Sequence, residues 1–304
     1  MTFADRFEGC ILAGAIGDAY GSAYENQKSL DEKTFYLFGK PEPKILDWRL
    51  TDDTQLTLAT CEALIEDINV SPETFVEAYL KLYRKNRITG IGASTLKSLK
   101  ELDFGMDWSV SGNRGEYAAG NGAAMRIAPL AFIKDVSKEK IRNICSITHN
   151  NDEAYVGALA IIVCLKAILN KEWVGESNLI EIVIDEIPDT RLRDRLVEID
   201  SKKNKDRIEE IGRLGNDGYV VNSVPLAIAS AQLAPSIGIR RMYESLRAVG
   251  GDTDTNCSMA GQIAGTLLGA DQIPNDFKNS LMKLKEYNWI NTTIRNFIDV
   301  IGRS

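Results

Sequence analysis

The sequence is poor in the residues on which several common functional sites depend. It has one histidine, His149, among 304 residues, so a zinc site built from several histidines is excluded. The five cysteines are an odd number and none forms a CxxC pair, which argues against a disulfide framework. We expect the cysteines to be small buried side chains in a protein of a reducing compartment.

Long apolar runs and an excess of positive charge are also missing. The longest apolar stretch, residues 156–169, contains Lys166 and falls short of the ~20 residues that cross a bilayer. The net charge of −7 argues against the broad basic stripe that nucleic-acid binding needs. The first residues do not have the pattern of a secretory signal. We therefore expect a cytoplasmic protein that contacts neither membranes nor nucleic acid.

What the sequence does have is helical periodicity. Alternating strands are absent, although residues 181–184 would also suit a short strand. No linker rich in proline, glycine or serine divides the chain, so we predict one all-α domain over residues 1–304. The predicted helices include 55–67, a helix with Ser71 as its cap and Pro72 at its first position, 157–169, a surface hairpin over 189–214, 224–233, 259–268 and 281–301.

Two acidic motifs each precede an apolar helix. Residues 51–54 read Thr-Asp-Asp-Thr, and residues 250–256 read Gly-Gly-Asp-Thr-Asp-Thr-Asn. Either motif alone also suits a helix N-cap, because Asp and Thr are favoured there. If the two helices pack side by side, however, Asp52, Asp53, Asp252 and Asp254 converge. Buried carboxylates cannot stay unpaired, and oxygen donors suit Mg²⁺ or Mn²⁺, so the pair of motifs predicts bound divalent cations.

Glycine clusters are further candidates for ligand loops, because glycine permits unusual turns and close approach of a ligand. The clusters are Gly14, Gly17 and Gly21; Gly90 and Gly92; Gly112, Gly115, Gly120 and Gly122; and Gly250 and Gly251. The first cluster lies in a small-residue helix that contains Asp18, a candidate polar anchor. Glu25 follows this helix, and by itself it would suit a surface loop.

Five segments in this order resemble the ADP-ribosylglycohydrolase family, which includes the bacterial dinitrogenase-reductase-activating glycohydrolases. The resemblance covers about residues 8–270. The segments are residues 14–25, residues 51–54, residues 120–126 (Gly-Asn-Gly-Ala-Ala-Met-Arg), Thr148 with His149, and residues 250–255.

The resemblance implies an orthogonal helical bundle with a dinuclear Mg²⁺ or Mn²⁺ centre. It implies that Thr51, Asp52 and Asp53 bind one ion, that Asp252 and Thr255 bind the other, and that Asp254 bridges them. Catalytic roles fall to Glu25, Asp53 and Asp254, and Glu25 matches a mobile acidic residue of the family. The implied substrate contacts are Gly90, Gly92, Gly120, Asn121, Gly122, Met125, Arg126 and His149. A helix-terminal or core histidine remains the plainer interpretation of His149, and no GxSxG elbow accompanies it.

The implied activity is hydrolysis of ADP-ribose from a modified protein or a small conjugate, with arginine as the expected linkage. Two alternatives stay open at this point. The chain could bind ADP-ribose, or an ADP-ribosylating toxin or enzyme, and act as an immunity protein by occlusion. It could also be a dinuclear phosphohydrolase that cleaves the pyrophosphate. The six metal-ligand positions together with Glu25 favour a glycohydrolase.

Overall fold

The computed structural model describes residues 1–24, 47–202 and 207–302. Within these ranges the chain forms 14 α-helices, three short 3₁₀ helices and no strand, so the predicted all-α class is confirmed. The described residues also form two isolated β-bridges, which pair Asn113 with His149 and Gly120 with Tyr219. Residues 181–184 lie in a helix and not in the alternative strand.

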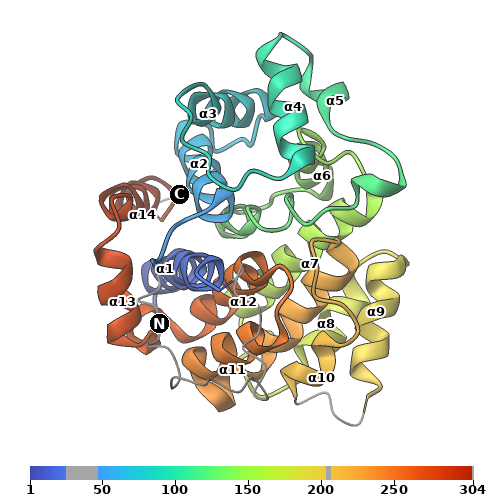
Figure 1. The fold of residues 1–304 in the computed structure, drawn as a ribbon, viewed down its shortest axis with the longest axis vertical. Helices are drawn as coiled ribbons and strands as arrows, with labels where there is room; N and C mark the ends of the chain where they lie inside the picture. The colour runs from blue at the N-terminus through green and yellow to red at the C-terminus, as the bar shows by residue number, and fades with distance from the viewer. Residues whose placement is uncertain (25–46, 203–206, 303–304) are drawn as a thin grey trace, which may run out of the picture.

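The helices group around a central pair, α1 and α12, which lie side by side (Figure 1). On one side of this pair lie α2 to α6, and on the other lie α8 to α11. The α-helices are α1 (Phe3–Ser22), α2 (Asp52–Glu66), α3 (Pro72–Arg84), α4 (Ala93–Asp103), α5 (Trp108–Ser111), α6 (Lys138–Ser146), α7 (Asp152–Leu169), α8 (Leu179–Glu186), α9 (Arg191–Asp200), α10 (Ile208–Gly212), α11 (Val220–Val249), α12 (Thr253–Leu268), α13 (Asn275–Met282) and α14 (Tyr287–Ile301).

Glycines on both helices allow α1 and α12 to approach closely. A Cβ added to Gly17 would lie 2.3 Å from the carbonyl oxygen of Cys257, and one added to Gly265 would lie 2.1 Å from that of Gly9. The glycine cluster at residues 14, 17 and 21 is therefore a packing surface inside α1, and its prediction as a ligand loop was wrong. The close contact brings the first turn of α12 beside the end of α1.

We expect Gly17→Ala to lower the free energy of unfolding by about 1–3 kcal/mol, because the new methyl group would push the two backbones apart. Denaturant unfolding measures this change. Gly92→Ala is the matched control for stability: Gly92 has an ordinary negative φ of −64° and no atom within 4 Å of the added Cβ. Equal stability of the two variants would show that the central pair is not tightly packed.

Two predicted helices have other bounds in the structure, whereas the predicted hairpin is helical as expected. The helix expected over 281–301 is divided into α13 and α14, because α13 packs on α1 whereas α14 packs mainly on α2. The hairpin expected at the surface over 189–214 is helical in its described residues: α9 and α10 pack against α11 through buried side chains, while Val197 stays exposed. The helix expected from residue 55 starts three residues earlier, at Asp52.

Helix α11 is longer than the predicted 224–233 helix. It contains Pro225 and Pro235 and kinks at Gly238, where φ is +80°. Its length and mean hydropathy of 1.3 would suffice to cross a membrane, but 67% of this apolar window is buried inside the molecule. A buried core helix passes the same test, and α11 packs on α7, α9, α10 and α12.

Candidate active site

The start of α2 is held in place by a buried carboxylate on α1. Asp18 is fully buried and accepts hydrogen bonds from the backbone N–H groups of Thr51 and Thr54, each at 3.1 Å. It also accepts from the Thr51 hydroxyl at 2.8 Å and from the Thr54 hydroxyl at 2.5 Å. Asp18 is thus the polar anchor that the sequence suggested, and it fixes the Thr51–Asp53 segment at the N-terminus of the helix.

Asp53 links α2 to α12. Its Oδ2 atom accepts a hydrogen bond from the Thr255 hydroxyl at 3.1 Å and lies 3.3 Å from the Thr51 hydroxyl oxygen. Its Oδ1 atom is buried and has no hydrogen-bond partner among the described residues. A buried carboxylate oxygen without a partner is energetically costly, so this atom points to a missing positive group.

The turn before α12 is fixed by two left-handed glycines and one asparagine. Gly250 and Gly251 have φ values of +74° and +78°, which disfavour other residues. The Asn216 carbonyl accepts from the Asp252 N–H at 2.9 Å, and a Cβ on Gly251 would lie 2.4 Å from that carbonyl oxygen. Asp252 is the N-cap residue but makes no side-chain cap; its Oδ2 instead accepts from the Asn121 amide at 2.6 Å. The capping explanation therefore does not account for this carboxylate.

The loop before α4 also leads to the acidic cluster. The Gly92 N–H donates to Asp52 Oδ2 at 3.2 Å. Gly90 has φ of +76°, and a Cβ there would lie 3.5 Å from the Thr51 Cβ. This places the loop with the predicted substrate contacts Gly90 and Gly92 directly beside the start of α2.

These segments enclose a cleft of about 710 Å³. The structure brings nearly all predicted metal and substrate positions to its wall: Thr51, Asp52, Asp53, Gly90, Gly92, Gly120, Asn121, Gly122, Met125, His149, Asp252, Asp254 and Thr255. Sequence reasoning missed Arg49, Thr89, Ser94, Thr95 and Asp217, which also line it. The hydroxyls of Ser94 and Thr95 were identifiable, because they directly follow the predicted ligand loop of Gly90 and Gly92. No pattern in the sequence indicated Arg49.

Two predicted positions are not on this wall. Glu25 lies outside the described residues. Arg126 is buried, is not among the cleft residues, and points into the core, where its guanidinium donates to the Tyr79 hydroxyl at 3.1 Å and to the Thr148 hydroxyl at 2.7 Å. Direct substrate contact by Arg126 was therefore a wrong prediction, since the side chain of neighbouring Met125 takes the cleft side.

Burial and mutual repulsion make the acidic cluster hard to ionise. Burial, together with the nearby charges of Asp18 and Asp252, raises the pKa of Asp52 to about 7. Burial, followed by the charge of Asp254, raises the pKa of Asp53 well above its ordinary value. Burial also raises the pKa of Asp18 to about 6, against its hydrogen bonds to the two threonines. A bound cation would offset both effects and let these carboxylates ionise.

These shifts predict a pH-dependent stabilisation by divalent cations. The folded chain holds these protons more tightly than the unfolded chain, so the stability of the metal-free protein falls as the pH rises from about 4 to about 7. A cation that binds only the ionised cluster restores this loss. Melting curves with Mg²⁺ and with EDTA should differ more at about pH 8 than at about pH 5. An equal difference at both pH values would contradict the cluster as the binding site.

The oxygen donors of the cleft suit hard divalent cations, although the described carboxylates do not form a complete coordination shell. No three Asp, Glu, His or Cys side chains among the described residues lie close enough to hold an ion as they stand. The orphaned Asp53 oxygen nevertheless needs a positive partner. The Thr51 hydroxyl donates its hydrogen to Asp18 and accepts from the Asp53 N–H at 3.4 Å, which leaves one lone pair available. Carboxylate and hydroxyl oxygens are the ligands that Mg²⁺ and Mn²⁺ prefer.

Fold and site together define an all-helical protein with an oxygen-rich acidic cleft at the meeting point of helix N-termini. Comparison with known proteins agrees with this class. The ADP-ribosylglycohydrolase family profile matches residues 1–304. A solved structure of an ADP-ribosylglycohydrolase-related protein complex superposes with a TM-score of 0.70, at 23% identity, over 98% of this chain and 99% of the other.

Two relatives that are named as ADP-ribose hydrolases are similar over most of their length. Human ADP-ribosylhydrolase ARH3 is 26% identical over 90% of this chain and 88% of its own. The ADP-ribosylarginine hydrolase Tri1 of Pseudomonas putida is 26% identical over 90% of this chain and 73% of its own. The chain belongs to the ADP-ribosylglycohydrolase family, and it is a glycosyl hydrolase.

Proposed function

We propose that this enzyme releases ADP-ribose from a modified target, with ADP-ribosyl-arginine on a protein or small conjugate as the substrate. The observation that carries the proposal is the orphaned Asp53 oxygen inside a cleft where the N-termini of α2 and α12 meet. The names of the human and Pseudomonas relatives support the ADP-ribosyl substrate, and that of the Pseudomonas relative supports the arginine linkage. The five cysteines are buried and free, which supports a reducing, cytoplasmic location.

Two divalent cations, Mg²⁺ or Mn²⁺, are part of this proposal. Thr51, Asp52 and Asp53 would hold one, Asp252 and Thr255 the other, and Asp254 would serve both. When bound, such ions supply positive charge that orients the ribose hydroxyls and a water molecule. Asp18 and Asn121 hold two of these ligands in place through hydrogen bonds, Asp18 to Thr51 and Asn121 to Asp252.

The remaining residues of the cleft bind and orient the substrate. The Gly90–Gly92 loop and the first turn of α4 present backbone N–H groups and hydroxyls, which suit a pyrophosphate. Gly120, Gly122 and Met125 form the wall beside His149. Breaking the bond at C1″ of ADP-ribose passes through an oxocarbenium-like state, so the leaving group or the water needs a proton-transfer group. We assign that role to Glu25.

A panel of ADP-ribosylated substrates with and without EDTA tests this proposal. Arginine-, serine- and DNA-linked ADP-ribose, each labelled on the adenosine, would be incubated with the full chain and Mg²⁺. We expect intact ADP-ribose from the arginine substrate and none after chelation. Release of AMP would identify a phosphohydrolase. Tight binding without release would identify a protein that acts by occlusion, for example against an ADP-ribosylating toxin.

A further inference from the structure

Behind the cleft, a buried arginine is connected to the single histidine through one threonine. The Arg126 guanidinium donates to the carbonyl of Gly122, to the Tyr79 hydroxyl and to the Thr148 hydroxyl oxygen, the last at 2.7 Å. The same Thr148 oxygen lies 2.8 Å from His149 Nδ1. Because arginine can only donate, the Thr148 oxygen must accept from it.

This direction fixes the protonation of His149. If His149 Nδ1 carried the proton, the Thr148 oxygen would accept two hydrogen bonds, and its own hydrogen would have no acceptor among the described residues. A buried hydroxyl hydrogen without an acceptor is costly. The Thr148 hydroxyl therefore donates to Nδ1, and the neutral ring carries its proton on Nε2.

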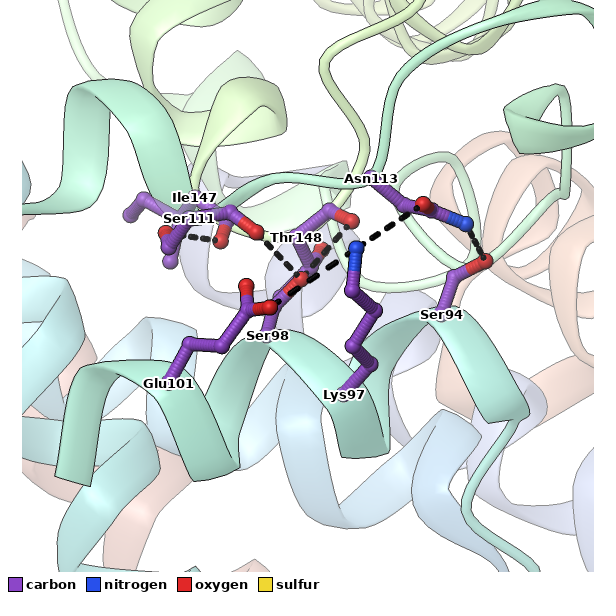
Figure 2. Close-up of polar contacts among 8 residues, drawn as sticks. All are labelled: Ser94, Lys97, Ser98, Glu101, Ser111, Asn113, Ile147 and Thr148. Atoms are coloured by element: carbon purple, nitrogen blue, oxygen red, sulfur yellow. Dashed lines mark hydrogen bonds and ion pairs between the residues drawn. The ribbon is translucent and has the colours of Figure 1, made fainter. Parts of the chain in front are cut away.

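The peptide that carries this pair cannot turn freely. The Ser98 hydroxyl on α4 shares its hydrogen between the carbonyl oxygens of Ser111 at 3.1 Å and Thr148 at 3.2 Å, and the Ser111 hydroxyl donates to the carbonyl of Ile147 at 2.9 Å (Figure 2). The backbone N–H of Asn113 also donates to the Thr148 carbonyl, at 3.1 Å. These contacts hold the two carbonyls that precede His149 and so fix the backbone from which the ring extends.

Gly120 and Gly122 lie beside the Nε2 edge of the His149 ring in the wall of the cleft, and their lack of side chains leaves this edge uncovered. A Cβ on Gly120 would lie 3.3 Å from His149 Nε2, and a Cβ on Gly122 would lie 2.8 Å from Cε1. Burial and the charge of Arg126 also lower the pKa of His149 to about 3, so the ring stays neutral at physiological pH. A neutral ring whose Nδ1 already accepts a hydrogen bond can offer the substrate a donor and nothing else.

We propose that Arg126 and Thr148 are positioning residues that lock His149 as an Nε2–H donor for a phosphate or ribose oxygen of the ligand. His149 then recognises the substrate and transfers no proton. This inference rests on the proposed function for the identity of the ligand, but the state of the ring can be tested without any ligand.

Because the chain has one histidine, ¹⁵N-histidine labelling of the full chain, purified without a histidine tag, gives the ring signals of His149 alone. We expect a protonated Nε2 and an unprotonated, hydrogen-bonded Nδ1 that do not change between about pH 5 and pH 8. A proton on Nδ1, or an imidazolium signal in this range, would overturn the proposal. Neither result depends on catalysis, so failure of the proposed function would leave this test intact.

Thr148→Val and Thr148→Ser test the connecting residue. Valine removes the hydroxyl at nearly constant shape, so the Nδ1 signal should shift and ADP-ribose affinity should fall roughly 3- to 10-fold. Serine restores the hydroxyl and should restore both readouts. Ring signals in Thr148→Val identical to those of the wild type would refute the role of Thr148. If the valine variant does not fold, a loss of the wild-type ring signals in folded Thr148→Ser would refute it instead.

Discussion

Asp254→Asn is expected to reduce turnover by more than roughly 100-fold and to weaken Mg²⁺ binding by at least as much. Asp254 lies in the first turn of α12, lines the cleft, and its charge acts on Asp53 in α2. An amide is a weaker ligand than a carboxylate, and it removes one of the charges that the two helices bring together. Isothermal titration with Mg²⁺ and a turnover assay measure the two effects. Asp185→Asn, an exposed acid on α8, is the matched control.

The same substitution has an opposite expected effect on the metal-free protein. Because the buried carboxylates repel each other, Asp254→Asn should melt at a higher temperature than the wild type in EDTA at about pH 8. With Mg²⁺ the order should reverse, since only the wild type gains from binding. A normal Mg²⁺ affinity in Asp254→Asn, or a variant that is less stable under both conditions, would remove Asp254 from the cation site.

Glu25→Gln is expected to lower turnover by about 10²- to 10⁴-fold, the usual contribution of a general acid or base. Glutamine keeps the size of the side chain but cannot exchange a proton. ADP-ribose affinity, measured by calorimetry in the presence of Mg²⁺, should stay within a few-fold of the wild type. Glu25 follows α1 closely in the sequence, and α1 packs against α12 up to Gly21, whose added Cβ would lie 2.5 Å from the Asp254 Cα.

Glu176→Gln, in an exposed loop far along the chain, controls for the loss of one negative charge. Retained turnover in Glu25→Gln would assign the proton transfer to another group. His149 would not be its replacement, because a neutral imidazole with a pKa of about 3 neither takes up a second proton nor gives up its Nε2 proton near neutrality. Loss of ADP-ribose binding together with turnover would show that Glu25 contributes to affinity and not to the chemical step.

The helices and the acidic motifs were predictable because their signals are local. Apolar spacing indicated the helix that became α7, and Asp-Thr motifs before apolar runs indicated the starts of α2 and α12. That the two starts meet in one cleft did not follow from any local pattern; it rested on the resemblance to a family. Side-chain direction was equally hidden, so Arg126 was placed in the cleft beside Met125 although it points into the core.

Glycine gave the most misleading signal. Gly250 and Gly251 have positive φ values and form a turn at the site, as expected. Gly14 and Gly17 instead lie inside α1 and serve close helix packing. Composition does not separate these two uses, but their spacing does, because residues three and four apart share one helix face. The same spacing recurs at Gly261 and Gly265 on the facing surface of α12.

The most direct test of whether α2 and α12 share their ions is anomalous diffraction at the manganese absorption edge, from a crystal grown with Mn²⁺. We expect anomalous peaks within bonding distance of carboxylate oxygens from both helices, including Asp53 Oδ1. Anomalous peaks near the carboxylates of one helix alone would contradict the proposed centre. So would a structure without peaks in which Asp53 and Asp254 lie apart, and either result would also contradict the mechanism built on this centre.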